Sequence, residues 1–348
     1  MSIKAIDLFC GIGGLTHGFV KAGIPVVAGI DIDATCEFAY TENNNSKFIL
    51  HDVGTYPSEE ISEMFGESKT KILMGCAPCQ PFSTLQKNEQ DKTKESRWGL
   101  LYSFLDHIEK VKPEIVSMEN VPSLRNEVVF KDFVKELEES GYNVSYEVVD
   151  SSEYGVPQRR KRLLLLASKL GEIKLIEPTH KNNKVTVREA IGNLPEIIQG
   201  QTHEEDPLHR AASLNTVNIE RIKSSIPGGT WRDWDEKLLP ACYRRESGKT
   251  FSSVYGRMEY DTVSPTLTTQ FNRYGTGRYG HPEQDRAISL REGAILQSFP
   301  ADYKFVSTSN YNITDVARQI GNAVPVRLGE VIAISIKNHL KGLGYDER

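Results

Sequence analysis

The sequence predicts an α/β protein built on a doubly wound sheet, with a second, smaller and loop-rich domain. Three observations predict this fold. Short apolar runs bounded by turn residues alternate with segments of helical periodicity over the first 180 residues. Residues 181–286 lose this alternation and are rich in Gly, Arg, Tyr and polar residues, and residues 287–348 regain helical patterning. Alternating strands and helices form parallel sheets with right-handed crossovers.

The expected strands of the first half are short and apolar, as is typical of a sheet that is buried on both faces. They are KAIDLF (4–9), VVAGID (26–31), FILHDV (48–53), KILMGC (71–76) and EIVSMENV (114–121), and a further pair follows at 142–150 and 162–168. Helical periodicity between them is clearest at Leu101, Phe104, Leu105, Ile108 and Val111, and at Phe130, Phe133, Val134 and Leu137 before the expected stop at Gly141.

The composition excludes several classes of protein. Of the 348 residues, 39% are hydrophobic and 26% are charged, which excludes collagen-like and disordered chains. No apolar run approaches the roughly 20 residues of a transmembrane helix, and the N-terminus has no signal-peptide pattern. We therefore expect a cytoplasmic protein that contacts no membrane, with its five cysteines reduced. The net charge of −5 is weak evidence about a nucleic-acid partner.

The stretch DLFCGIGGLTHGF (7–19) follows the first strand and opens a helix. Its glycines let the backbone turn tightly and approach a ligand, and the helix N-terminus offers free amide donors. Thr16 stands where the dinucleotide-binding pattern GxGxxG has its last glycine, so dinucleotide binding is disfavoured.

Two acidic residues end the second and third expected strands. Asp31 follows Gly11 by 20 residues, where a carboxylate can accept both hydroxyls of a ribose. Asp52 is placed to accept from an adenine amino group. Either acid alone could be a helix cap or a solvated loop end. At the carboxyl ends of consecutive strands, the two together predict an adenosyl cofactor.

The uncharged stretch GCAPCQPFS (75–83) holds two cysteines, Cys76 and Cys79. A redox pair is disfavoured because Pro81 follows too closely for the helix that such motifs open. A zinc site would need two more ligands, and the other three cysteines offer no matching pair. Cys76 is expected to pack at a strand end. Cys79 lies in a proline-stiffened loop at the carboxyl end of the fourth strand, where open α/β sheets bind ligands.

The motif ENV (119–121) places the carboxyl group of Glu119 at the end of the next strand. A thiolate beside a carboxylic acid that burial keeps protonated can attack an electron-poor heterocycle, because the sulfur adds to the ring while the acid protonates a ring nitrogen. A lone cysteine in such a place can also be inert. The hypothesis is therefore that Cys79 and Glu119 act together in covalent catalysis.

These motifs resemble those of the DNA (cytosine-5)-methyltransferases of bacterial restriction-modification systems. The family's order and spacing are matched by DLFCGIGG, PCQPFS, ENV, QRRKR (158–162), LREGAILQSFP (290–300) and GNAVP (321–325). The resemblance covers nearly the whole chain outside 181–286. It implies a Rossmann-like methyltransferase sheet at 1–180, a target-recognition domain at 181–286, and a return of the chain to the catalytic domain at 287–348.

The resemblance also implies an activity. The enzyme would methylate carbon 5 of a specific cytosine in double-stranded DNA, using S-adenosylmethionine, releasing S-adenosylhomocysteine and requiring no metal. Cys79 would add to carbon 6 of the flipped-out base, and Glu119 would protonate ring nitrogen 3. Arg160 and Arg162 match arginines that hold the base, although taken alone they could be phosphate contacts or a solvated turn. Matched cofactor positions are Phe9, Gly11, Gly13, Leu15, Asp31, Ile32, Asp52, Pro78 and Asn322.

The implied partners are a short specific DNA site and a restriction endonuclease, and the enzyme is expected to be a monomer. Residues 241–280 mix six Lys/Arg with tyrosines, which suits a surface that grips phosphates and stacks on bases, or simply a polar surface. Residues 80–99 resemble a loop that closes over the base, with Ser83 as a DNA contact. One alternative is a tRNA cytosine-5 methyltransferase, which the large second domain disfavours. Another is a catalytically silent DNA-binding relative, which the intact Cys79 and Glu119 disfavour.

Overall fold

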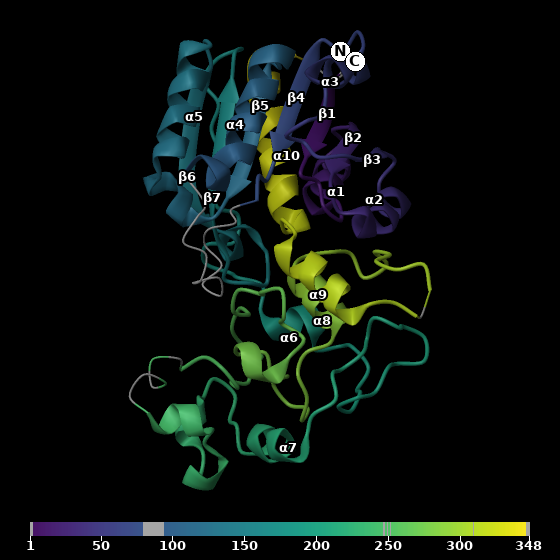
Figure 1. The fold of residues 1–348 in the computed structure, drawn as a ribbon, viewed down its shortest axis with the longest axis vertical. Coiled ribbons are helices and arrows are strands. Elements are labelled where there is room, and N and C mark those ends of the chain that lie inside the picture. The colour runs from purple at the N-terminus through teal and green to yellow at the C-terminus, as the bar shows by residue number, and fades with distance from the viewer. Residues whose placement is uncertain are drawn as a thin grey trace. The chain divides into compact units, whose positions relative to one another are not determined.

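The computed structural model describes residues 3–78, 94–245, 248, 250, 252–308 and 310–345. The chain divides into two compact units (Figure 1). The first comprises Met1–Ser151, Lys161–Thr179 and Val324–Arg348, and the second comprises Ser152–Arg160 and His180–Ala323. The role of residues 181–286 in target recognition concerns function and stays a prediction.

A seven-stranded sheet forms the centre of the first unit, in the order β3-β2-β1-β4-β5-β7-β6. Strands β1 to β5 run parallel, and β7 runs antiparallel to both of its neighbours. This sheet confirms the predicted fold class. The strands are β1 (Ile3–Leu8), β2 (Val26–Asp31), β3 (Lys47–Leu50), β4 (Thr70–Gly75), β5 (Ile115–Asn120), β6 (Asn143–Asp150) and β7 (Lys161–Ser168).

Strand β3 is shorter than the expected run 48–53. The chain leaves the sheet after Leu50 because the side chain of Asp52 accepts a hydrogen bond from the Gly54 amide at 2.8 Å and folds the backbone into a turn. The apolar residue of that turn, Val53, is still buried. A buried apolar residue beyond the strand end therefore extended the predicted strand too far.

The order of the strands reverses between β1 and β4. From β1 the chain adds β2 and β3 on one side of the sheet, and it then returns to place β4 on the other side. The β1–β4 pairing runs from Ile3↔Thr70 to Leu8↔Gly75, so the loops after both strands leave the sheet at the same edge. Open α/β sheets bind ligands at such a switch point. One of these loops carries the glycines and the other leads to Cys79.

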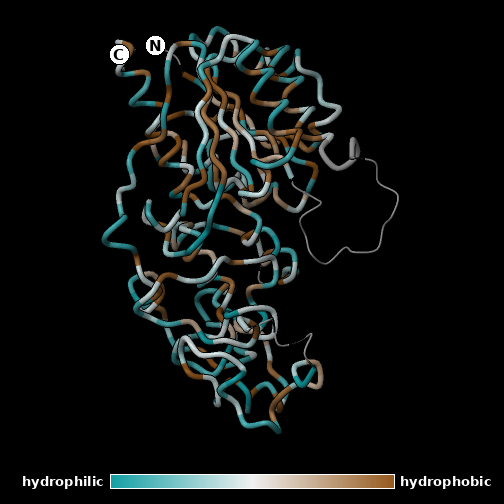
Figure 2. The backbone as a smooth tube through the Cα atoms, turned by 90° about the vertical axis from the view of Figure 1, so that its left-hand side faces the viewer, coloured by the Kyte–Doolittle hydropathy of each residue, from teal (hydrophilic) through white to brown (hydrophobic). Residues whose placement is uncertain are grey.

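Helices cover both faces of this sheet. Alternate strand residues such as Ile6 and Val116 share one apolar core with the helices α3, α4 and α5. The intervening residues, among them Ala5 and Ile115, are completely buried as well. Figure 2 shows the strands as hydrophobic stretches, as a sheet covered on both sides requires. The helices of this unit are α1 (Gly14–Lys21), α2 (Glu37–Asn43), α3 (Ser58–Phe65), α4 (Lys94–Val111), α5 (Val128–Glu139) and α10 (Val326–Gly342).

Helix α10, from the end of the chain, packs against α1. Two glycines allow this close contact. A Cβ atom on Gly18 would lie 2.5 Å from backbone atoms of Val326 and Glu330, and one on Gly329 would lie 3.0 Å from the carbonyl oxygen of Leu15. Because α1 begins directly after the glycine-containing loop, α10 supports the element that positions that loop.

The second unit is rich in loops. Its β pairings outside named strands are isolated bridges, so many of its backbone carbonyls need other donors. Buried arginines supply them: Arg257 donates to the carbonyl oxygens of Ile222, His281 and Gln284 at 2.8 to 2.9 Å. The helices of this unit are α6 (Val187–Ile191), α7 (Thr216–Lys223), α8 (Leu290–Leu296) and α9 (Ile313–Asn322).

Candidate active site

The loop between β1 and α1 has an unusual backbone. Phe9, Gly11 and Gly13 all have positive φ angles, of 61°, 50° and 83°. For Phe9 this conformation is strained. A Cβ atom on Gly11 would meet nothing within 4 Å, so the glycine is required by its φ angle and open space lies beside it. The loop therefore leaves room for a ligand next to its backbone.

Asp31, at the end of β2, fastens this loop. Its Oδ2 accepts the amide hydrogen of Gly11 at 2.8 Å, and its Oδ1 accepts that of Asp33 at 2.9 Å. Burial raises the pKa of Asp31, and these two backbone donors act against the shift. Each carboxylate oxygen keeps a second lone pair. Asp31 can therefore hold the loop and accept a ligand hydroxyl at the same time.

The neighbouring positions that are predicted to bind the cofactor differ in exposure. Ile32 is 70% exposed, as a side chain that covers an aromatic ring of a ligand would be. Asp52 is half-buried after β3, beside β2. Leu15 is buried within α1, so its side chain is part of the packing. Pro78 is exposed at the last described position of the loop after β4.

Beneath the loop lies a buried acid that the sequence reasoning missed. Asp7 is 1% exposed and accepts a hydrogen bond from Thr16 Oγ1 at 2.7 Å. Burial raises the pKa of Asp7 to about 7. The hydroxyl oxygen of Thr16 also lies 3.2 Å from that of Tyr40. Thr16, the residue that departs from GxGxxG, thus connects β1 to α2. A hydroxyl side chain at a position where the pattern has glycine is the sequence signal that could have revealed this role.

Glu119 lies at the end of β5 and is 2% exposed. Its Oε1 is 2.7 Å from Nε of Arg162, and its Oε2 accepts the thiol hydrogen of Cys76 at 2.8 Å. Among the described residues, Oε1 has this ion pair but no hydrogen bond. An incompletely bonded carboxyl oxygen in a buried place favours a further partner, such as a polar group of a substrate.

The antiparallel strand β7 explains how Arg162 reaches Glu119. Asn120 pairs with Leu163, so Arg162 continues β7 just past the carboxyl end of β5. Asn120 also donates to the carbonyl oxygen of Ala77 at 3.0 Å, which fastens the end of β5 to the loop after β4. The structure thus gathers Glu119, Arg162 and the residues leading to Cys79. Cys79 and Ser83 themselves lie outside the described residues.

Arg160 belongs to the second unit, together with Asn322. The residue is 3% exposed, and its guanidinium donates to the carbonyl oxygens of Leu267 and Gly321 at 3.1 Å and of Ala323 at 3.4 Å. It therefore holds the backbone on both sides of Asn322, whose own position is exposed at the end of α9. These contacts with backbone carbonyls favour a positioning role for Arg160.

Two glutamines extend this network. Gln158 Nε2 donates to Gln297 Oε1 at 2.8 Å, and Gln297 Nε2 donates to the carbonyl oxygen of Ile320 at 2.7 Å. Gln297 Nε2 also lies 3.2 Å from the carbonyl oxygen of Ala323. Buried side chains thus link three motifs that lie far apart in the sequence, QRRKR, LREGAILQSFP and GNAVP.

A model of the family of C-5 cytosine-specific DNA methylases matches residues 3–338. The chain belongs to this family. Type II methylase M.HgiDII of Herpetosiphon aurantiacus is 50% identical over 347 residues, which cover 99% of this chain and 97% of its own length. Type II methyltransferase M1.HphI of Haemophilus parahaemolyticus is 30% identical over 97% of this chain and 87% of its own. The Entamoeba histolytica methyltransferase EhMeth shares the fold, with a TM-score of 0.65, 14% identity, and coverage of 98% of this chain and 99% of its own.

The protein is therefore a DNA (cytosine-5)-methyltransferase of the Type II restriction-modification family. This confirms the predicted family and the predicted enzyme class. Its fold is that of methyltransferases that depend on S-adenosylmethionine, which implies this cofactor. The residues assigned to catalysis and cofactor binding remain predictions.

Three further observations concern this methylase. Its first unit has a cavity of about 500 Å³ between the residues after Asp52 and helix α4, and none of the predicted site residues lines it. Among the described residues, no group of three or more His, Cys, Asp or Glu side chains could hold a metal ion. None of the helices in the described ranges is long and apolar enough to cross a membrane.

Proposed function

We propose that this methylase transfers a methyl group to carbon 5 of one cytosine within a short specific site of double-stranded DNA, through a covalent adduct on Cys79. The observation that carries the proposal is the buried Glu119, held by Arg162 and lying beside the first residues of the cysteine loop. Covalent activation of a pyrimidine ring needs an acid close to a thiol, and Cys79 follows Cys76, whose thiol contacts Glu119, by three residues in the sequence.

The cofactor site in this proposal is the loop after β1. Its open space at Gly11, the spare acceptor capacity of Asp31 and the exposed Ile32 fit the main chain, ribose and adenine contacts of an adenosyl group. Asp52 accepts from the adenine amino group. When bound, S-adenosylmethionine supplies the electrophilic methyl group. The remaining positions assigned to the cofactor are Phe9, Gly13, Leu15, Pro78 and Asn322. Leu15 acts through its backbone because its side chain is buried.

The chemistry on the base begins at Cys79. Its thiolate forms a bond to carbon 6 of cytosine while Glu119 gives a proton to ring nitrogen 3, so that the ring becomes an enamine with a nucleophilic carbon 5. After carbon 5 has gained the methyl group, a base removes the proton of carbon 5, ring nitrogen 3 returns its proton to Glu119, and the bond to Cys79 breaks, which restores the aromatic ring. Arg162 keeps the carboxyl group of Glu119 oriented toward the base. Arg160 holds the backbone around Asn322.

Access to carbon 6 requires the cytosine to leave the duplex, because the stack covers both reacting carbons. In this proposal residues 181–286 of the second unit read the site, and residues 80–99 close over the flipped base. The biological role that we propose is protection of DNA against a partner restriction endonuclease. The enzyme acts in the cytoplasm as a monomer.

Bisulfite sequencing of DNA from cells that express the protein tests the proposal. We expect 5-methylcytosine at one position of a recurrent short sequence, and none in cells that express the Cys79→Ser variant. Purified protein should also form a cofactor-dependent covalent adduct with DNA containing 5-fluorocytosine. Methylation of tRNA without methylation of duplex DNA would instead favour a tRNA methyltransferase, and failure to trap any nucleic acid would favour a silent relative.

A further inference from the structure

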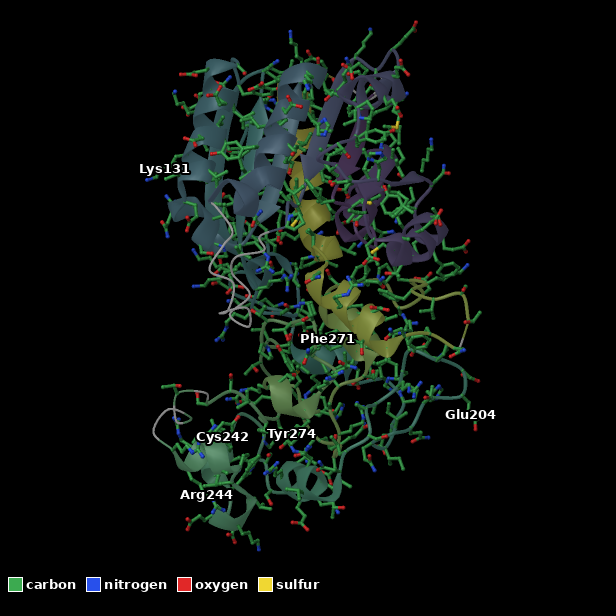
Figure 3. The ribbon with its side chains drawn as sticks, viewed as in Figure 1. Lys131, Glu204, Cys242, Arg244, Phe271 and Tyr274 are labelled. Atoms are coloured by element: carbon green, nitrogen blue, oxygen red, sulfur yellow. The ribbon has the colours of Figure 1, made fainter. Side chains whose placement is uncertain are left out.

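The loop of residues 268–279 in the second unit presents one arginine in a distinctive way. Phe271 is completely buried, and Asn272 and Tyr274 are 6% and 2% exposed. Arg273, between them, is exposed. Its backbone is extended, with φ −113° and ψ 125°, so its side chain points away from the buried side of its neighbours. Figure 3 labels Phe271 and Tyr274, which flank this position.

Packing on both sides of Arg273 holds the loop in place. The ring of Phe271 fills the space where a side chain on Gly293 of α8 would stand. The hydroxyl of Tyr274 is hydrogen-bonded to Ser225 Oγ at 2.7 Å, and its ring meets that of Tyr255 edge to face at 5.3 Å. Two anchored aromatic residues therefore restrict the backbone that carries the arginine.

The backbone of Arg273 is fixed by hydrogen bonds as well. Its amide donates to the carbonyl oxygen of Gln270 at 3.0 Å. Thr276 Oγ1 lies 2.8 Å from the carbonyl oxygens of both Gln270 and Arg273. Because this backbone is already fixed, Arg273 loses little conformational entropy when it binds a partner. A side chain held in this way favours precise recognition.

The guanidinium of Arg273 has no hydrogen bond, ion pair or ring contact with any residue that the structure describes. Two other arginines of this unit are engaged: Arg188 makes a bidentate pair with Asp261 at 2.7 and 3.1 Å, and Arg278 donates to the carbonyl oxygen of Gly229 at 2.7 Å. Residues 262–282 contain no Asp or Glu. The guanidinium is thus exposed and held on a rigid loop that carries no negative side chain.

We infer that Arg273 reads a guanine in the DNA site, donating two hydrogen bonds to its O6 and N7. This inference rests on the proposed function and names a residue that sets its sequence preference. Bidentate contact with guanine is the commonest specific use of arginine in the major groove, and it requires a guanidinium that is positioned in advance and free of protein acceptors. A phosphate contact needs only positive charge, which the fixed backbone of Arg273 does not explain.

The test compares Arg273→Gln with Arg188→Gln, which removes the same charge from an arginine already paired with a carboxylate. Each full-length protein methylates a library of duplex DNA with randomised positions around cytosine, and bisulfite sequencing gives the preferred site. For Arg273→Gln we expect relaxed preference at one guanine position and a decrease in kcat/KM on the parent site of about 10- to 100-fold. Arg188→Gln should keep the parent preference.

Salt dependence separates a base contact from a phosphate contact. The slope of log affinity against log salt should be the same for Arg273→Gln and the parent protein. A slope smaller by about 1, with equal weakening on all sequences, would assign Arg273 to a phosphate and overturn the inference. An unchanged sequence preference in Arg273→Gln would overturn the inference too. Arg159 is also exposed, so a preference that is relaxed in Arg159→Gln and not in Arg273→Gln would overturn it as well. Absence of methylation by the parent protein would instead overturn the proposed function itself.

Discussion

Nε of Arg162 lies 2.7 Å from Oε1 of Glu119, and both side chains are shielded from solvent, with 13% and 3% of their areas exposed. The pair joins the ends of two strands, β7 and β5, that run antiparallel. An arginine–carboxyl contact in this shielded environment orients the carboxyl group more strictly than a solvated contact would, because few competing water molecules reach it. The orientation of the proposed proton donor therefore depends on Arg162.

Glu119→Gln should slow methyl transfer by a factor of about 10² to 10⁴, because an amide is a far poorer proton donor than a carboxylic acid. Affinity for duplex DNA should stay close to that of the parent, since the side chain of Glu119 is buried. The rate of a single turnover and a binding titration measure the two quantities. Equal single-turnover rates would show that the proton comes from another group.

Arg162→Lys should lower kcat by at least about tenfold while leaving the KM for S-adenosylmethionine unchanged. Lysine keeps the charge but lacks the planar group that fixes Glu119. Lys161→Gln, a change at an exposed position one residue earlier, is the matched control and should be nearly silent. If both variants behave alike in steady-state kinetics, Arg162 does not orient the acid.

Cys79→Ser should abolish methyl transfer, because a hydroxyl at neutral pH is a much weaker nucleophile than a thiolate. Cys76→Ser is the control within the same motif. It keeps a donor for Glu119 Oε2 and should retain most of the activity. Trapping on DNA that contains 5-fluorocytosine distinguishes the two, since only the variant at Cys76 should form the adduct. Adduct formation by Cys79→Ser would refute the assignment of the nucleophile.

Asp31→Asn should weaken the binding of S-adenosylmethionine by about 10- to 100-fold, because hydrogen bonds to a charged acceptor are lost or reversed. Calorimetric titration of the cofactor into the protein measures the dissociation constant without any need for activity. Glu37→Gln, at an exposed position in the following helix, serves as control. An unchanged constant for Asp31→Asn would place the ribose elsewhere.

The second unit should lose stability as the pH falls from 6.5 toward 4. Burial lowers the pKa of His281 to about 4, and its Nδ1 accepts hydrogen bonds from the amides of Glu283 and Gln284, which protonation would break. As the pH falls, His281 therefore takes up its proton in the unfolded chain before it does so in the folded protein. Up to about 3 kcal/mol of the free energy of unfolding is lost between pH 6.5 and 4, and none is lost above pH 6.5 through this group. Thermal melting followed by tryptophan fluorescence at several pH values measures the effect.

His281→Asn is the control for that experiment. The asparagine oxygen can replace Nδ1 as the acceptor, but the side chain does not titrate. Its melting temperature should vary less between pH 6.5 and 4.5 than that of the parent. The same dependence on pH in both proteins would assign the loss of stability to other groups.

Much of the first unit follows from local sequence pattern. The apolar runs predict its strands, since buried strands need continuous apolar residues, and the glycines at 11 and 13 predict a tight turn, in which both adopt positive φ angles. Strand β3 was predicted too long because Val53 is buried by the turn that Asp52 makes and not by pairing in the sheet. Burial and strand pairing are separate properties, and periodicity reports only the first.

The sequence by itself determined the order of the motifs, the α/β alternation and the residue types that this chemistry needs, because these depend on neighbours along the chain. The tertiary structure alone decided which of them meet. It placed Arg162 against Glu119 and Arg160 around Asn322, although the two arginines stand two residues apart. It also left Arg273 exposed while burying Arg257 and Arg286. Such differences arise from contacts between distant segments, which local pattern does not encode.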